Sequence, residues 1–165
     1  MTVRDLPADE VMEQLAEHPR RLASITARVP AAQLLAAPSP GEWSANEVLA
    51  HIRSCADVWG RCIARMLAED DPTIRAVSPR SYIDKTDYLD LQFKPSLRAF
   101  TQQRTELLAV LAELLPPEWM RTATVTGAGK ALVRTVLFYA QWLADHERIH
   151  VGQIEQTVAA VRLTR

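Results

Sequence analysis

The sequence has little of several features that mark particular protein classes. It holds two cysteines, Cys55 and Cys62, and five glycines in 165 residues. No apolar run approaches the roughly 18 residues that a membrane-spanning helix needs. The N-terminal stretch MTVRDLPADEVMEQL also lacks the apolar core of a secretion signal. We therefore expect a chain that is neither secreted nor inserted in a membrane.

The chain also has no large excess of positive or negative charge. Nineteen basic side chains oppose twenty acidic ones, which leaves a net charge of -1 at pH 7. Because phosphate binding needs a cationic face, this balance argues against nucleic acid and against a membrane surface as partners. On one helix the two cysteines would be about 10 Å apart, too far for a disulfide. We expect them to be reduced, in a cytoplasmic protein.

Helical periodicity is the main signal that is present. Few glycines and no useful alternating segments argue against a sheet-rich fold. Apolar residues instead recur at spacings of three and four along four long segments. These segments predict a first helix over 11–29 that breaks at His18 and resumes at Pro19, a second over 44–70, a third over 92–115 and a fourth over 130–162. Turn signals and a short extended piece are expected over 118–129.

The second helix has well-defined ends. Ser44 and Glu47 match the Ser-x-x-Glu capping box, and the helix must stop before Pro72. The linker over 71–90 is long enough for the third helix to run parallel to the second. We predict an all-α fold for residues 1–165: one domain, a four-helix bundle with a long connection between its second and third helices.

Histidines carry the clearest chemical signal. His146 and His150 are four residues apart and share one face of the fourth helix, in its inward seam. His51 lies on a face of the second helix, with Val48 and Cys55, that is also predicted to be buried. Three neutral imidazoles plus water form an open, catalytic type of metal site. The alternative is that all three are ordinary core histidines.

The segment from His146 to His150 also fits H-E-x-x-H, the pattern of zinc proteases. That mechanism needs a third ligand farther along the chain. Glu155 is the only carboxylate after His150, and its spacing points it away from the ligand face. A peptidase is therefore disfavoured.

In their order along the chain, several short stretches resemble the DinB-like family of four-helix-bundle metal proteins, which includes the YfiT-like thiol transferases and hydrolases. The matching stretches are His18-Pro19-x-x-Leu22, Pro40-Gly41-Glu42-Trp43-Ser44 leading to His51, Arg65-Met66-Leu67 before Pro72, Phe100 with Arg104, Gly129, and His146-x-x-x-His150-x-x-Gln153-Ile154.

This resemblance covers nearly the whole chain. It implies a metal triad of His51, His146 and His150, with Zn²⁺ or Ni²⁺ as the expected ion. Two positions depart from the family pattern. Glu147 stands where an Asp often follows the first histidine of the pair, and His18 stands where a Thr often precedes the proline.

Other residues of the seam are candidate substrate-binding groups. Arg104 either holds a substrate carboxylate or forms a structural ion pair with a second-helix acid such as Glu47 or Asp57. Cys55 either reaches the metal or a substrate thiol, or it is a small buried hydrophobe. Tyr139, like Gln153, flanks the histidine pair as a pocket group or as an ordinary seam residue.

The resemblance implies a metal-dependent enzyme that transfers a low-molecular-weight thiol to an electrophile, or a hydrolase. The ion would lower the pKa of a bound water or thiol. The alternative is a non-catalytic metal-binding bundle, such as a stress-related binding protein or a dimeric scaffold. The expected partners are a small-molecule substrate, for example such a thiol, and a second copy of the chain in a homodimer. A cavity beside the metal would favour the enzyme.

Overall fold

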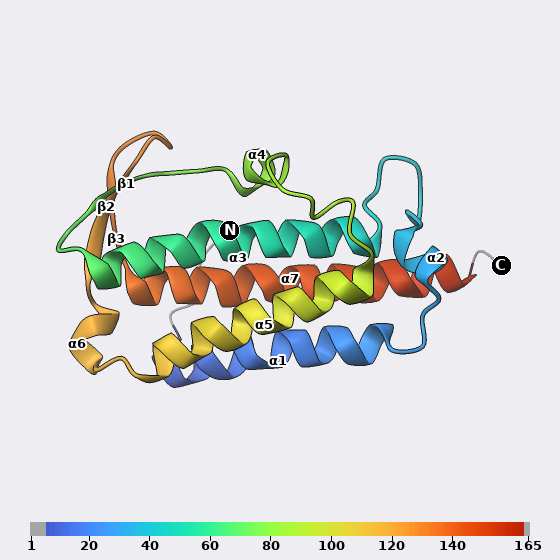
Figure 1. Cartoon of the computed structure of the whole chain (residues 1–165), viewed down its shortest axis with the longest axis horizontal. Helices are drawn as coiled ribbons and strands as arrows, with labels where there is room; N and C mark the ends of the chain where they lie inside the picture. Colours follow the sequence, from blue (N-terminus) through green and yellow to red (C-terminus); the bar gives the residue numbers. More distant parts are fainter. Residues whose placement is uncertain (1–5, 164–165) are drawn as a thin grey trace.

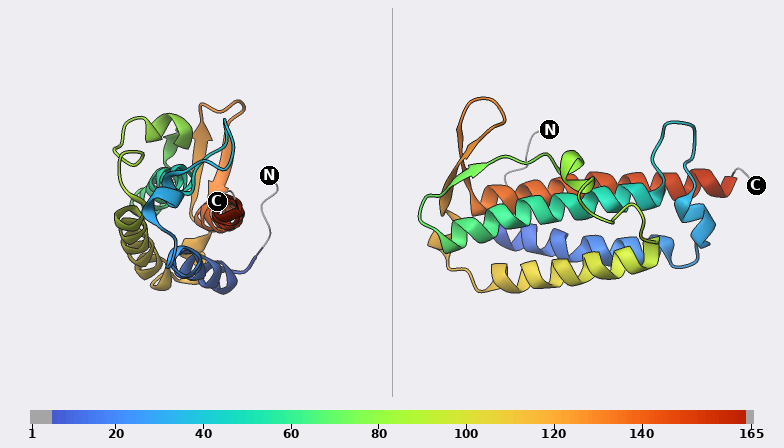
Figure 2. Two further views of the ribbon diagram at one scale, coloured as in Figure 1. Left: turned by 90° about the vertical axis from the view of Figure 1, so that its right-hand side faces the viewer. Right: turned by 45° about the horizontal axis from the view of Figure 1, so that its top comes forward.

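Four long helices lie side by side in the computed structural model, which describes residues 6–163 (Figure 1). They are α1 (Ala8–Thr26), α3 (Ala45–Ala68), α5 (Phe93–Ala112) and α7 (Val136–Leu163). Helix α7 packs against α3 and α1, and α5 packs against the same two helices. The end-on view of Figure 2 places one helix at each corner. The predicted four-helix bundle is confirmed.

The helices run in two directions. Helices α1 and α7 point one way along the bundle, and α3 and α5 point the other way (Figure 1). Because α3 and α5 are parallel, the chain between them must return along the length of the bundle. This long connection, residues 69–92, contains β1 (Thr73–Arg75) and α4 (Pro79–Ile83). It is the connection that the sequence predicts.

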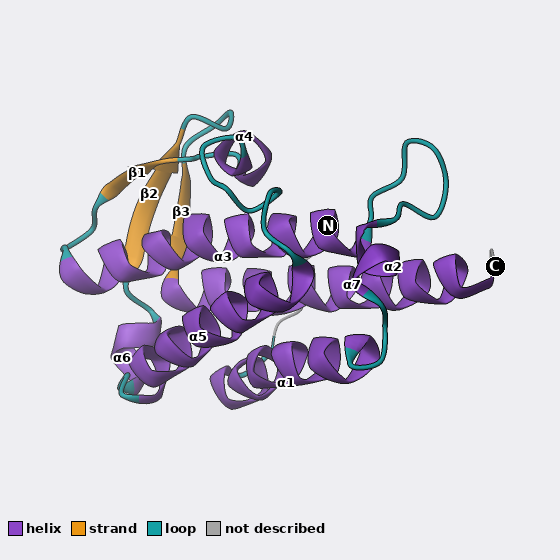
Figure 3. Ribbon diagram, turned by 45° about the vertical axis from the view of Figure 1, so that its right-hand side comes forward, coloured by secondary structure: helices purple, strands orange, loops and turns teal. Residues whose placement is uncertain are grey.

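Short elements close the two ends of the bundle. Strand β2 (Thr122–Thr126) pairs in parallel with β1 and antiparallel with β3 (Leu132–Thr135). This small sheet lies at one end, and α2 (Ala31–Leu35) with the loop after it lies at the other (Figure 3). A further short helix, α6 (Pro116–Trp119), follows α5.

The predicted break in the first helix is wrong. Helix α1 continues through His18 and Pro19. Proline has no N–H, so the carbonyl of Leu15 loses its usual helical partner. The apolar face that includes Val11 and Leu22 is fully buried, and we attribute the continuity of the helix to that burial.

The predicted start of the fourth helix, near Lys130, is also wrong. Residues Leu132–Thr135 form β3 instead, so their backbone groups are used in pairing with β2. Helix α7 begins at Val136, and Thr135 caps it by accepting the N–H of Phe138 at 3.0 Å. The β-branched residues in this stretch favour the strand.

The start of α3 matches the prediction and positions an aromatic ring. The Ser44 hydroxyl accepts the Glu47 N–H at 3.2 Å, and the Ser44 N–H donates to the Glu47 carboxylate at 2.7 Å. In the preceding turn, Gly41 has a φ of 85°, where a side chain would be strained. The turn brings Trp43 next to α3, with its ring 5.3 Å from that of His51.

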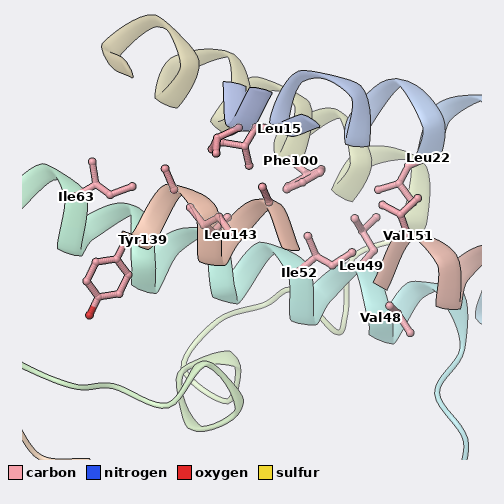
Figure 4. Close-up of a cluster of buried hydrophobic side chains, with 14 of the residues drawn as sticks. Leu15, Leu22, Val48, Leu49, Ile52, Ile63, Phe100, Tyr139, Leu143 and Val151 are labelled. Carbon is pink, nitrogen blue, oxygen red and sulfur yellow. The ribbon is translucent and has the colours of Figure 1, made fainter. Parts of the chain in front are cut away.

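The core is made by apolar side chains from all four long helices. Leu15, Ile52, Phe100 and Leu143 are examples, and each is completely buried (Figure 4). Both cysteines are free and buried, as the sequence predicts. None of the helices in residues 6–163 is long and apolar enough to cross a membrane.

Candidate metal centre

Helices α3 and α7 direct imidazole rings into the same part of the bundle. The centroid of the His51 ring lies 5.1 Å from that of His146 and 4.9 Å from that of His150. The His146 and His150 rings are 4.4 Å apart. The two helices are antiparallel neighbours, so the first third of α3 meets the middle of α7. The structure brings together the three histidines that the resemblance implies.

Cys55 adds a fourth donor to this cluster. Its Sγ lies 3.6 Å from Nε2 of His51 and 4.0 Å from Nε2 of His146. Donor atoms of these three residues all lie within 4.8 Å of one another, which makes them a possible metal site. Cys55 is completely buried one helical turn after His51. We call His51, Cys55, His146 and His150 the metal cluster.

The donor spacing of the metal cluster fits a divalent ion. The Nε2 atoms of His146 and His150 are 3.2 Å apart. Two imidazole nitrogens on one tetrahedral zinc are separated by roughly 3.3 Å, and an imidazole nitrogen and a thiolate sulfur by roughly 3.6 Å. The N–N distance, and the distance between Cys55 Sγ and His51 Nε2, agree with these values. The longer contact of Cys55 with His146 would have to shorten slightly.

A neighbouring amide fixes which nitrogen of His150 is free. The side-chain oxygen of Gln153 lies 2.7 Å from Nδ1 of His150. An amide oxygen only accepts, so Nδ1 carries the proton and Nε2 keeps its lone pair for a metal. His146 has no such partner: its buried Nδ1 makes no hydrogen bond within residues 6–163. Its ring packs edge-on against Trp59 at 4.9 Å instead.

Burial keeps the three imidazoles of the metal cluster neutral. Burial, followed by the nearby His150, lowers the pKa of His51 from its ordinary value to about 4. Burial lowers the pKa of His146 to about 3, and it also lowers the pKa of His150. Neutral imidazole is the form that binds metal, so all three are in the binding form at pH 7. Burial also raises the pKa of the Cys55 thiol far above its usual range.

A cavity of about 560 Å³ opens beside the metal cluster. Its lining includes His150, Gln153 and Thr157 of α7, Trp43 from the loop before α3, and Arg80 of α4. The other three members of the metal cluster do not line it. The cluster therefore has an outer side, at His150, that faces the cavity. Its inner side is formed by Cys55 and by the ring of Trp59.

A second buried cluster surrounds Glu147, the residue that follows His146 on α7. The Glu147 carboxylate forms an ion pair with Arg104 and accepts a hydrogen bond from His18 Nδ1 at 3.1 Å. Glu147 is 0% exposed and Arg104 is 2% exposed. We call His18, Arg104 and Glu147 the ion-pair cluster. The two positions that depart from the DinB-like pattern, His18 and Glu147, are in direct contact.

This arrangement corrects several expectations for the seam. The structural partner of Arg104 is Glu147 on the last helix, and the expected pairing with Glu47 or Asp57 is wrong. Arg104 does not line the cavity beside His150, so it is not placed to hold a substrate there. Glu147 is likewise bound in the ion pair and is not available as the general base that an H-E-x-x-H site needs.

Tyr139 and Cys55 also lie outside that cavity. Tyr139 is seven residues before His146, which is about 10 Å along the helix. Its ring belongs to the hydrophobic core, and its hydroxyl interacts with Cys62. The structure therefore does not bring Tyr139 to the histidines. Cys55 faces the donor atoms of the metal cluster and not the cavity.

Sequence reasoning identified neither Arg80 nor Trp43 as a residue of the site. Both line the cavity next to His150. Arg80 follows His51 by 29 residues in the chain, inside a connection with no regular spacing to either histidine helix. No periodic signal could have linked it to the site. Gln153 was detectable, since it lies one helical turn from His150.

Solved structures share this fold at low identity. YfiT from Bacillus subtilis, described as a probable metal-dependent hydrolase with an unusual four-helix bundle topology, matches with a TM-score of 0.80 and 17% identity, over 95% of this chain and 91% of that chain. The four-helix bundle protein TT2238 matches with a TM-score of 0.62 and 18% identity, over 91% and 99% of the two chains. No curated protein matches the sequence. The family profile of the DinB superfamily matches residues 14–154, and the chain therefore belongs to the DinB superfamily.

Proposed function

We propose that this protein is a divalent-metal-dependent enzyme whose ion is held by His51, His146 and His150. One observation carries the proposal: three neutral imidazoles converge, with two Nε2 atoms 3.2 Å apart, directly beside a cavity of about 560 Å³. Imidazole suits Zn²⁺ and Ni²⁺, and the soft thiol of Cys55 also suits Zn²⁺. The family and its fold support the same conclusion.

The protein groups around the ion have distinct tasks. Gln153 holds the His150 ring in the tautomer that presents Nε2 to the metal. Trp59 packs against both His146 and Trp142, and so covers the inner side against water. When bound, a divalent ion held by the three imidazoles would lower the pKa of a coordinated water or thiol and supply a nucleophile near neutral pH.

Two reaction classes fit this site: hydrolysis, and transfer of a low-molecular-weight thiol to an electrophile. YfiT, which shares the fold, is described as a probable metal-dependent hydrolase. The DinB-like resemblance supports both classes. The cavity favours an enzyme over a closed metal-binding scaffold, because the bundle leaves the outer side of the metal cluster accessible at His150. The substrate would be a small molecule, and a homodimer stays a prediction.

We further propose Cys55 as an inner metal ligand. Its Sγ is 3.6 Å from Nε2 of His51, the separation expected for two ligands of one zinc ion. Binding as a thiolate would require the loss of the thiol proton, which a coordinated divalent ion brings about directly. The ligand would lie on the inner side. With four protein ligands the ion would have to be five-coordinate to accept water or substrate from the cavity.

Metal analysis combined with activity assays tests the proposed function. Purified protein should contain about one Zn²⁺ or Ni²⁺ per chain. It should conjugate simple thiols to electrophiles, or hydrolyse small esters or amides. Removal of the ion with a chelator should abolish turnover, and adding the ion back should restore it. Fully metallated protein without either activity would favour the non-catalytic binding bundle, and protein that binds no divalent ion would remove the proposed site.

A further inference from the structure

The cavity beside the metal cluster contains a cationic side chain. Arg80 of α4 lines it together with Trp43 and His150. The Arg80 guanidinium carbon lies 5.5 Å from the centroid of the Trp43 ring, and that ring packs 5.3 Å from His51. The guanidinium is therefore on the outer side of the metal cluster, within the space that a substrate would occupy.

No carboxylate neutralises Arg80 within residues 6–163. Its recorded contact is the stacking on Trp43, and it takes part in no ion pair or hydrogen bond of that part of the chain. Its charge nevertheless reaches the site, since it contributes to the lowered pKa of both His51 and His150. An unpaired guanidinium is a fork of donors that matches a carboxylate.

The other groups around the cavity limit how much negative charge it accepts. Gln153, Gln156 and Thr157 supply neutral hydrogen-bonding groups from α7. Glu42, in the loop beside Trp43, is the one acidic residue among those that line the cavity. With one guanidinium and one carboxylate, the cavity suits a ligand that carries a single negative group near Arg80, and it disfavours a strongly polyanionic ligand.

We infer that the substrate is a small carboxylate-bearing molecule whose carboxylate is bound by Arg80 while a second group of the same molecule reaches the ion at His150. The inference rests on the proposed function, because that second group needs the metal. Arg80 is then the substrate-positioning cation, the role for which the sequence suggested Arg104. The long connection between α3 and α5 would then serve to place this residue at the mouth of the site.

A pair of matched thiols separates carboxylate binding by Arg80 from thiol binding by the metal ion. We would load the protein with Co²⁺ and titrate it with 3-mercaptopropionate and, separately, with its methyl ester, which has the same thiol without the charge. Binding is followed by the change in cobalt absorption on thiolate coordination. The acid should bind at least about tenfold more tightly than the ester. Arg80→Gln should reduce that ratio to about one, and Arg80→Lys should retain part of it.

Two further variants serve as controls. Lys85→Gln removes one positive charge from the same connection, but Lys85 lines a different cavity, so the acid-to-ester ratio should be unchanged. Glu42→Gln removes the carboxylate from the cavity and should increase the preference for the acid. Equal affinities of the unaltered protein for acid and ester, or a preference that survives in Arg80→Gln, would overturn the inference.

Failure of the proposed function gives a different result. If the protein does not bind Co²⁺, or if neither thiol changes the cobalt spectrum, the metal site or its access from the cavity is wrong, and the inference falls with it. If both thiols reach the cobalt with equal affinity, the proposed function stands and only the role of Arg80 is refuted.

Discussion

The metal cluster and the ion-pair cluster contain adjacent residues of α7, His146 and Glu147. They differ in whether their members carry opposite charges. In the ion-pair cluster a buried carboxylate is matched by the Arg104 guanidinium and by His18. In the metal cluster, imidazole nitrogens face one another, and no acidic residue belongs to the group. One cluster pairs its buried charges with each other, and the other consists of neutral donors that are able to bind a cation.

This difference explains why only one cluster is suited to bind a metal ion. Consecutive helix residues point about 100° apart, so Glu147 faces α1 and α5 while His146 faces α3. The same rotation of α7 that points Glu147 toward α1 and α5 also turns His146 and His150 toward His51. A carboxylate partner gives the buried His18 a structural role. The pair His146 and His150 has no carboxylate hydrogen-bond partner within residues 6–163 and is the candidate ligand set.

The largest expected effect comes from removing a ligand of the metal cluster. His146→Ala or His150→Ala should lower metal affinity by at least about 100-fold, since each removes one of three imidazole ligands. The helices should persist. The matched control is His18→Ala, which removes an imidazole from the ion-pair cluster and should leave metal content unchanged. Elemental analysis after dialysis decides, and full occupancy in either ligand variant would refute the site.

The bundle and the histidine face could be predicted because both depend on local spacing. His146 and His150 are one helical turn apart, and the Ser44–Glu47 box marks the start of α3 within one residue. The periodic apolar pattern then indicates which face is buried. These features need only the geometry of a single helix.

Contacts between distant segments could not be predicted in this way. The partner of Arg104 lies 43 residues away on α7, and the His18 contact spans 129 residues. Periodicity shows that these side chains are buried, but not which of them meet. The boundary errors at Pro19 and Lys130 have a related cause, since tertiary burial and strand pairing override the local preference there.

Breaking the ion-pair cluster should affect stability and not metal content. Glu147→Gln leaves the Arg104 charge buried without an anion, and should destabilise the protein by about 3–5 kcal/mol. Urea unfolding measures this loss. The double variant Arg104→Met with Glu147→Gln should recover most of it, because no unpaired charge remains. Normal stability of Arg104→Met, combined with weakened thiol binding, would instead assign Arg104 to the substrate.

The contribution of Cys55 to the metal cluster should be smaller. Cys55→Ser replaces a soft thiolate by a hydroxyl at the inner side and should weaken Co²⁺ binding about tenfold, or ~1.4 kcal/mol. The near-ultraviolet charge-transfer band of the cobalt protein should also disappear. Cys62→Ser is the control on the same helix, because the Cys62 thiol donates to the Val58 carbonyl and is not part of the candidate metal site found within residues 6–163. A band that persists in Cys55→Ser would exclude the thiolate ligand.

The last expected effect is the pH response of the metal-free protein. The pKa of His51 falls to about 4 and that of His146 to about 3 on folding, from an ordinary 6.5. Between these values and pH 6.5 the unfolded chain binds more protons than the folded one, so stability rises with pH in this window. It should therefore be lost progressively as the pH falls from 6.5 toward 4.

Melting temperatures of the metal-free protein between pH 7 and pH 4.5 measure this loss, which we expect to amount to roughly 10 °C. Carboxylates begin to titrate in the lower part of the same range, so the informative quantity is the difference from His51→Gln with His146→Gln. That double variant retains the carboxylates but lacks the two imidazoles, and its melting temperature should fall less. Parallel curves for the two proteins would mean that folding does not lower these two pKa values. The metal cluster would then be well hydrated, and protons would compete with the metal for its histidines already near pH 6.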